Sequence, residues 1–248
     1  MPVEETGPLP RGLLDRLPAR LPARSRPGSG GLRAADLAVL RDGGYLKLAL
    51  PARLGGAGLS LKDVACAQRQ LAARAPGTAR ALNEHHAWAG GAADALASGE
   101  TGAEWILAEV ARGRLFTVDG KTGRDVLSAG RYAWRLALDG MTSYAVARQA
   151  FDQAVEQARQ AGPGRLDRWP VAEAALRLDS MRGQLDEIIA GWQRRVAAGR
   201  ELASLDPGRL TLIRQFTARH VAEDGAQRVI ELAALIAGDA VPAGNPSG

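Results

Sequence analysis

An apolar stripe in residues 171–196 constrains the fold more than any other feature of the sequence. Its members recur at spacings of three and four residues: Val171, Ala174, Leu178, Met181, Leu185, Ile188, Trp192 and Val196. That spacing gathers them on one face of an α-helix, whereas a β-strand would spread them over both faces. A long helix with one apolar face is stable only when other helices cover that face. The stripe therefore predicts a helical bundle.

Two neighbouring segments show the same periodicity and complete the predicted bundle. The apolar positions before the stripe are Tyr144, Ala147, Phe151, Ala154 and Ala158. Those after it are Leu212, Phe216, His220, Val229, Leu232 and Ile236. The turns at 162–164 and 206–208 are short, and short connections between long amphipathic helices make antiparallel neighbours. Residues 131–238 are predicted to form a C-terminal antiparallel bundle, followed by a flexible tail at 239–248.

The first half of the chain also reads as helical, so the predicted fold class is all-α. Residues 32–113 are expected to form an N-terminal helical domain, with helices over 32–41, 60–74, 78–97 and 104–112. Residues 1–31 are rich in proline and glycine and are predicted to be a disordered lead. The bridge at 114–130 has an alternating trace at 115–118, enough for one strand or a hairpin at most.

Composition excludes several classes of protein. The chain has 248 residues, 46% hydrophobic and 24% charged, which is typical of a soluble globular protein. It has no uninterrupted apolar run of membrane-spanning length and no secretory signal pattern. The single cysteine, Cys66, cannot form an internal disulfide, and a cytoplasmic location is expected. The net charge of +5 comes from dispersed arginines rather than a basic stripe, so no nucleic-acid partner is expected.

A glycine-rich segment at 44–60 is the most informative short stretch. Pro51 fixes a turn, and Gly55, Gly56 and Gly58 allow positive φ or close backbone approach. The segment lacks the phosphate-loop and dinucleotide fingerprints, so a structural turn is favoured over a ligand loop. Ser60 is predicted to cap the next helix, with Asp63 three residues further on.

The same segment carries a family resemblance. The pattern Gly44-Tyr45, Leu50-Pro51 and Leu54-Gly55-Gly56-Ala57-Gly58-Leu59-Ser60, followed by an alanine-rich helix, resembles the N-terminal helical domain of acyl-CoA dehydrogenases. Residues 133–159, 169–195 and 213–238 resemble helices of that family's C-terminal bundle, in the same order. The resemblance implies FAD as cofactor, an acyl thioester as ligand and flavin-linked oxidation as activity.

The resemblance also implies where a cofactor would lie and what is missing. Arg159 and Gln160 approximate the family's turn that reaches the FAD pyrophosphate, and Gly238 stands at the family's glycine pair. The family inserts a β-barrel domain between its helical halves, where this chain has only residues 114–130. A segment of that length cannot close a barrel. The family's catalytic glutamate has no counterpart, so the catalytic residues are unknown.

Two functions from different classes follow. One is a flavin-linked oxidoreductase acting on an acyl thioester, with FAD held at a subunit interface. The other is a non-catalytic helical partner or assembly subunit derived from the same family. In both, the resemblance implies a homodimer, a homotetramer or association with a complete family member.

Histidine and cysteine residues add no predicted catalytic or metal site. His85 and His86 point about 100° apart on a helix, which disfavours a shared metal ion and favours a helix interface. His220 falls on an apolar face, where a hydrogen-bonded core histidine is favoured over an acid–base role. Cys66 lies in an alanine-rich helix, which favours a buried, inert thiol.

Overall fold

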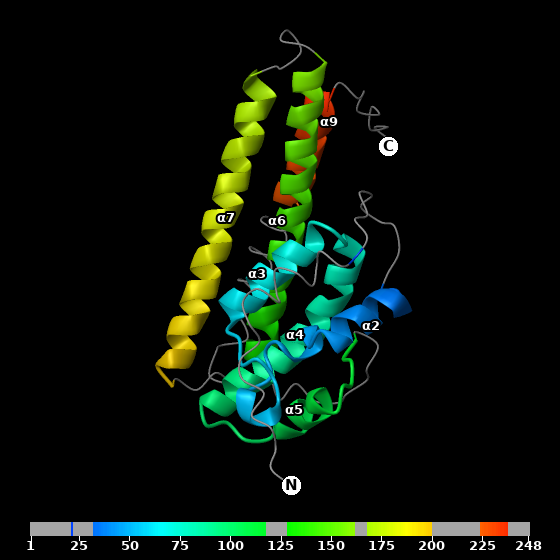
Figure 1. The fold of residues 1–248 in the computed structure, drawn as a ribbon. Coiled ribbons are helices and arrows are strands. Elements are labelled where there is room, and N and C mark those ends of the chain that lie inside the picture. Colours follow the sequence, from blue (N-terminus) through cyan, green and yellow to red (C-terminus); the bar gives the residue numbers. More distant parts are fainter. Residues whose placement is uncertain (1–20, 22–31, 118–127, 162–167, 200–223, 238–248) are drawn as a thin grey trace, which may run out of the picture.

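The protein is described here by a computed structural model that places residues 21, 32–117, 128–161, 168–199 and 224–237 (Figure 1). Within these residues the regular structure is helical throughout, and no strand occurs. This confirms the predicted all-α fold. No helix in this part of the chain is both long and apolar enough to cross a membrane.

In the described part of the N-terminal half there are four α-helices: α2 (Ala34–Asp42), α3 (Leu61–Ala72), α4 (Pro76–Ala97) and α5 (Glu104–Ala111). Ser60 caps α3 as predicted, since its side chain accepts a hydrogen bond from the Asp63 backbone N–H at 3.4 Å. Helix α4 begins two residues earlier than the sequence predicted. Pro76 occupies its first turn, where the missing N–H has no intrahelical partner to lose.

The glycine-rich segment is a structural turn, which confirms the prediction. It contains two 3₁₀ turns, η2 (Tyr45–Lys47) and η3 (Ala52–Leu54). Gly55 and Gly58 have φ of 81° and 61°, a region that favours glycine. The N–H groups of residues 55–59 donate to carbonyls of the same segment, at 2.8 to 3.3 Å. Those donors are therefore engaged within the loop itself.

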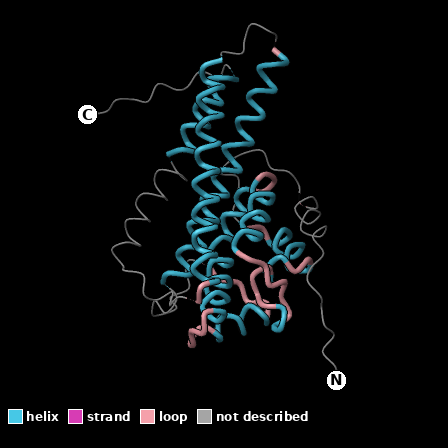
Figure 2. Tube along the Cα trace, turned by 90° about the vertical axis from the view of Figure 1, so that its left-hand side faces the viewer, coloured by secondary structure: helices cyan, strands magenta, loops and turns pink. Residues whose placement is uncertain are grey.

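Among the residues placed in the C-terminal half, three helices occur: α6 (Ser128–Gln160), α7 (Arg168–Ala197) and α9 (Gly225–Ala237). Helix α6 is the central element, because it packs against α3 and α4 on the N-terminal side and against α7 and α9 in the bundle (Figures 1 and 2). The buried apolar residues of both halves belong to one cluster. Helices α6 and α7 are neighbours joined through residues 162–167, which lie outside the described part.

The C-terminal stripes are largely confirmed. Ala174, Leu178, Met181, Leu185 and Trp192 of α7 are buried. Ile189 is buried, whereas Ile188 is only half-buried. Between Val171 and Trp192 the predicted stripe repeats every 3.5 residues on average, slightly less than the 3.6 residues of a helical turn. Its positions therefore drift around the helix, and the buried face moves to the next residue. Val229, Leu232 and Ile236 of α9 are buried as predicted, whereas positions 212, 216 and 220 lie outside the described residues.

The described ends of the bridge differ from the prediction. Residues 115–117 form no strand, and the Phe116 N–H donates to Nδ1 of His85 at 3.3 Å instead of to a ladder. The Phe116 ring lies 5.8 Å from the Trp88 ring and 6.1 Å from the Trp105 ring, centroid to centroid. Residues 128–130 already belong to α6. Residues 118–127 lie outside the described part.

Candidate functional site

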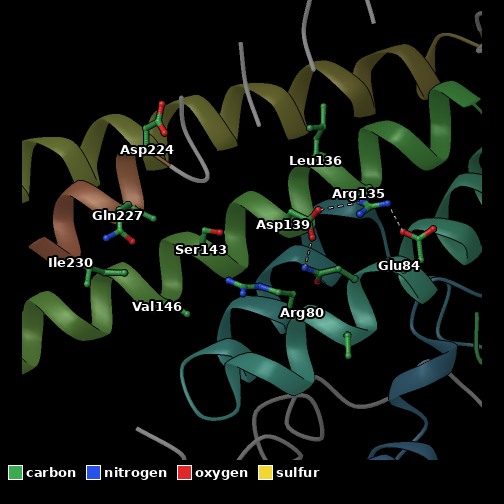
Figure 3. A pocket seen from close by; sticks show the side chains of 13 residues that line it. Arg80, Glu84, Arg135, Leu136, Asp139, Ser143, Val146, Asp224, Gln227 and Ile230 are labelled. Atoms are coloured by element: carbon green, nitrogen blue, oxygen red, sulfur yellow. Dashed lines mark hydrogen bonds and ion pairs between the residues drawn. The ribbon is translucent and has the colours of Figure 1, made fainter. Parts of the chain in front are cut away.

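A cavity of about 690 Å³ lies between α4, α6 and α9 (Figure 3). Its volume is within the range of small-molecule sites in proteins. Helix α6 contributes the largest share of its wall, with α4 on one side and the start of α9 on another. The lining side chains are Arg80, Ala81, Asn83, Glu84, Arg135, Leu136, Asp139, Ser143, Val146, Asp224, Ala226, Gln227 and Ile230.

One end of the cavity is an ionic cluster centred on Glu84. This carboxylate is only 4% exposed, and two arginines of α6 pair with it. Nε of Arg131 donates to Oε1 at 3.0 Å, and Nη1 of Arg135 lies 2.9 Å from Oε2, close enough for an ion pair although not aligned as a hydrogen bond. The Arg131 guanidinium also lies 4.0 Å from the centre of the Trp88 ring. A buried carboxylate is thereby compensated by two cations.

Asp139 joins this cluster to a buried hydrogen-bond chain. It accepts from Nδ2 of Asn83 at 2.8 Å and lies 3.4 Å from Nε of Arg135. The chain continues from Asn83 to Gln68, whose Nε2 donates to Oδ1 of Asn83 at 2.6 Å, and Gln68 accepts from the Tyr45 hydroxyl at 3.0 Å. Burial raises the pKa of Asp139, and the hydrogen bond from Asn83 partly offsets that shift. Burial therefore favours the protonated form of this lining carboxyl.

The other end of the cavity carries apolar side chains beside polar ones. Val146 and Ile230 lie there, away from the Glu84–Arg135–Asp139 cluster, and Gln227 and Asp224 of the third wall lie on the same side, with Ser143 between the two ends (Figure 3). Arg80 projects from α4 between them, and its guanidinium makes no ion pair or hydrogen bond with any described residue. The cavity thus offers an uncommitted cation, an ionic cluster at one end and apolar side chains at the other. It fits a ligand that has a polar or anionic head and an apolar tail.

The residues that the sequence assigned to FAD binding lie elsewhere. Arg159 and Gln160 are exposed at the end of α6, and neither lines this cavity. Nε2 of Gln160 donates to Glu156 at 2.9 Å. Gly238 lies outside the described residues. Neither Arg159 nor Gln160 lines either of the two described cavities.

The remaining sequence candidates are structural. His85 and His86 are both fully buried. His85 places Nε2 at 2.8 Å from the Leu46 carbonyl and accepts the Phe116 N–H at Nδ1, which defines a neutral ring protonated at Nε2. The described residues contain no group of three or more potential metal ligands. Cys66 is exposed, so the predicted buried thiol is wrong; it occupies the outward face of α3.

Comparison of the chain with known protein families, with curated proteins and with solved structures finds no match. The acyl-CoA dehydrogenase resemblance therefore stays a prediction.

Sequence reasoning missed the cavity residues Asn83, Glu84, Arg135 and Asp139. Each is a common polar residue on an amphipathic helix, and the α4 members lie roughly 50 positions from their α6 partners. One signal was available. Glu84 lies shortly before a run of small and apolar residues at 87–92, and a carboxylate on a buried helix face requires a cationic partner.

Replacing Glu84 with glutamine is expected to lower the free energy of unfolding by about 2 kcal/mol, because the charge-assisted hydrogen bond from Arg131 and the ion pair with Arg135 are lost. The value stays below that of a fully buried ion pair, because these arginines are 30% and 43% exposed and can be hydrated. Urea denaturation measures it. The control is Glu187→Gln, in an exposed pair with Arg194, expected within about 0.5 kcal/mol of wild type. Equal effects of the two substitutions would contradict the assignment.

Proposed function

We propose that this chain is a helical, non-catalytic subunit that binds an acyl ligand, an acyl thioester in particular, in the cavity between α4, α6 and α9. The observation that carries the proposal is that the apolar side chains of Val146 and Ile230 lie away from the Glu84–Arg135–Asp139 cluster in that cavity (Figure 3). The resemblance to acyl-CoA dehydrogenases supports the same ligand class.

Each end of the cavity suits one part of such a ligand. Val146, Ala226 and Ile230 offer an apolar surface for the acyl chain. Arg80 is free to donate to the thioester carbonyl or to an anionic group next to it. Arg135 already pairs with Glu84 and Asp139, so it stabilises the cavity wall and is not free to bind the ligand.

The described residues do not form a flavin site by themselves. Arg159 is exposed, and it makes no ion pair with another described residue, so it is available to a pyrophosphate. However, neither Arg159 nor Gln160 lines a described cavity, and the Gln160 amide is bonded to the Glu156 carboxylate, which repels anions. The ten positions 118–127 are too few to close a barrel around the ring. For these reasons we assign no redox step to this chain.

A thioester of N-acetylcysteamine with a short acyl chain tests the proposal, because it carries no phosphate and isolates the acyl site. Wild type is expected to bind it saturably in calorimetry. Arg80→Gln, which removes the head contact, and Ser143→Phe, which fills the cavity, are each expected to weaken binding at least about tenfold, or about 1.4 kcal/mol. Arg41→Gln, an exposed arginine on α2, is the control and is expected to leave affinity unchanged. Absence of saturable binding by the wild type would refute the proposal.

Flavin-linked oxidation of the acyl thioester is the competing function, and the uncommitted Arg159 is the observation that favours it. It requires a second chain, a copy of this one or a complete relative, to supply the wall that shields the flavin ring. Titration with FAD, followed by visible absorbance and by light scattering, separates the two functions. A yellow, stoichiometric complex that forms together with a larger assembly would replace the non-catalytic proposal.

A further inference from the structure

A second cavity, of about 730 Å³, lies between α3 and α6. Its wall is rich in guanidinium and amide groups: Arg69, Gln70 and Arg74 come from the end of α3 and the turn after it, and Arg148, Gln149 and Gln153 come from α6. We name this site the arginine groove, and we call the cavity between α4, α6 and α9 the acyl cavity. Both sites use α6, but the other helices that line them, their charge and their position differ.

The arginine groove has an excess of positive charge. Its three arginines face one carboxylate, Asp152, and that carboxylate already accepts from Nε of Arg148 at 3.0 Å through both oxygens. Arg69 has only a weak contact, from Nη2 to Sγ of Cys66 at 3.8 Å. The guanidinium of Arg74 makes no ion pair or hydrogen bond with another described residue. Two guanidinium groups are therefore uncommitted.

The groove and the acyl cavity lie on opposite sides of α6. Asp139 lines the acyl cavity and Arg148 lines the groove. They are nine residues apart, which at 100° per residue amounts to two and a half turns. A ligand in one site therefore does not fill the other, and the two sites can be tested separately.

We propose that the arginine groove is a binding site for a small organic phosphate that carries at least two negative charges. Planar guanidinium groups match phosphate oxygens with two parallel hydrogen bonds, which makes arginine the preferred residue for such ligands. Two uncommitted arginines match a dianion. The volume exceeds what a lone phosphate fills and lies within the range of small-molecule sites.

Two further features bear on the ligand's orientation. The carbonyl end of α3 lies beside Ala73 and Arg74, and a helix C-terminus repels anions with about half an elementary charge. Two full positive charges outweigh that effect. Gln149 and Gln153 line the α6 side with amide groups that can donate to phosphate or ribose oxygens. The phosphate is therefore placed beside Arg69 and Arg74, with the organic part along α6.

Calorimetric titration with inorganic phosphate, pyrophosphate, ADP and adenosine tests the proposal. Wild type is expected to bind ADP saturably below about 1 mM, more tightly than inorganic phosphate, and not to bind adenosine. Arg69→Gln combined with Arg74→Gln is expected to weaken ADP binding at least about tenfold. Arg41→Gln combined with Arg53→Gln removes the same charge from exposed positions outside the groove and is expected to leave the affinity within about twofold.

A second variant keeps every charge and fills the space. Ala73 is exposed and lines the groove, so Ala73→Trp is expected to block ADP without unfolding the protein, with circular dichroism as the check. Three outcomes would overturn the proposal: no saturable binding of any anion by the wild type, equal weakening in the control double variant, or unchanged binding in Ala73→Trp. The phosphate-free thioester used for the acyl cavity reports on that site alone, so failure of one proposal is distinguishable from failure of the other.

Discussion

Replacing Gly91 with valine is expected to destabilise the protein by about 3 kcal/mol or more. The backbones of helices α4 and α6 are in close contact at this point. A Cβ on Gly91 would lie 2.5 Å from the backbone nitrogen of Arg131 and 3.0 Å from the carbonyl carbon of Gly130. These are backbone atoms, so no side-chain rotation relieves the contact and the two helices must separate. Urea denaturation measures the loss.

Gly183 on α7 is the matched control. It is also a glycine inside a long helix, but it is exposed, and a Cβ there would meet nothing within 4 Å. Gly183→Ala is expected to raise the free energy of unfolding by about 0.5 to 1 kcal/mol, because alanine loses less backbone entropy in a helix. A Gly91→Val variant as stable as wild type would show that α4 and α6 do not approach as closely as described.

This crossing also shows why the arrangement of the helices was harder to predict than the helices themselves. The apolar stripe of α7 and the Ser60 cap of α3 are local patterns with a fixed period or position, and the structure confirms both. Taken alone, the pair Gly90–Gly91 of α4 predicts a less stable helix, because glycine has a low helix propensity. Its role appears only when Trp134 and Arg131, 40 or more residues later, pack on it.

The candidate site could not be predicted from the sequence for the same reason. Asn83 and Glu84 are adjacent on α4, yet their partners Arg131, Arg135 and Asp139 come from α6. One sequence holds no information on which polar residue of one helix meets which of another. Periodicity shows which face of a helix is buried, but not its partner. Cys66 illustrates the limit: an alanine-rich neighbourhood suggested burial, whereas its position on α3 faces outward.

The free energy of unfolding is expected to fall as the pH is lowered from 7 to 5. Burial lowers the pKa of His85 and, more strongly, that of His86, so the folded protein binds fewer protons than the unfolded chain below about pH 6.5. Each histidine that burial keeps neutral lowers the free energy of unfolding by up to about 1.4 kcal/mol for each unit by which the pH falls in this window. Burial raises the pKa of Asp94 and Asp139, which bind protons first in the folded state and so oppose the loss at the acidic end.

His86 is the larger contributor because its surroundings offer nothing to stabilise a charge. Neither ring nitrogen has a hydrogen-bond partner among the described residues. Its ring meets those of Tyr45 and His85 edge-on, both at 5.4 Å between centroids. Tyr45 is itself buried, which raises its pKa, so it stays neutral across this range. A protonated His86 would therefore face two uncharged rings, with no hydrogen bond to a described residue to stabilise the charge.

Leucine at each position separates the effect of protonation from that of hydrogen bonding. His86→Leu is expected to keep the stability at pH 7 within about 1 kcal/mol and to remove about one proton from the pH dependence. His85→Leu also flattens the pH dependence, but it leaves the Leu46 carbonyl and the Phe116 N–H without their partner, at a cost of about 2 kcal/mol at pH 7. An unchanged pH slope in His86→Leu would contradict the assignment. Because the two residues are adjacent and equally buried, their difference at pH 7 isolates the hydrogen bonds that only His85 makes.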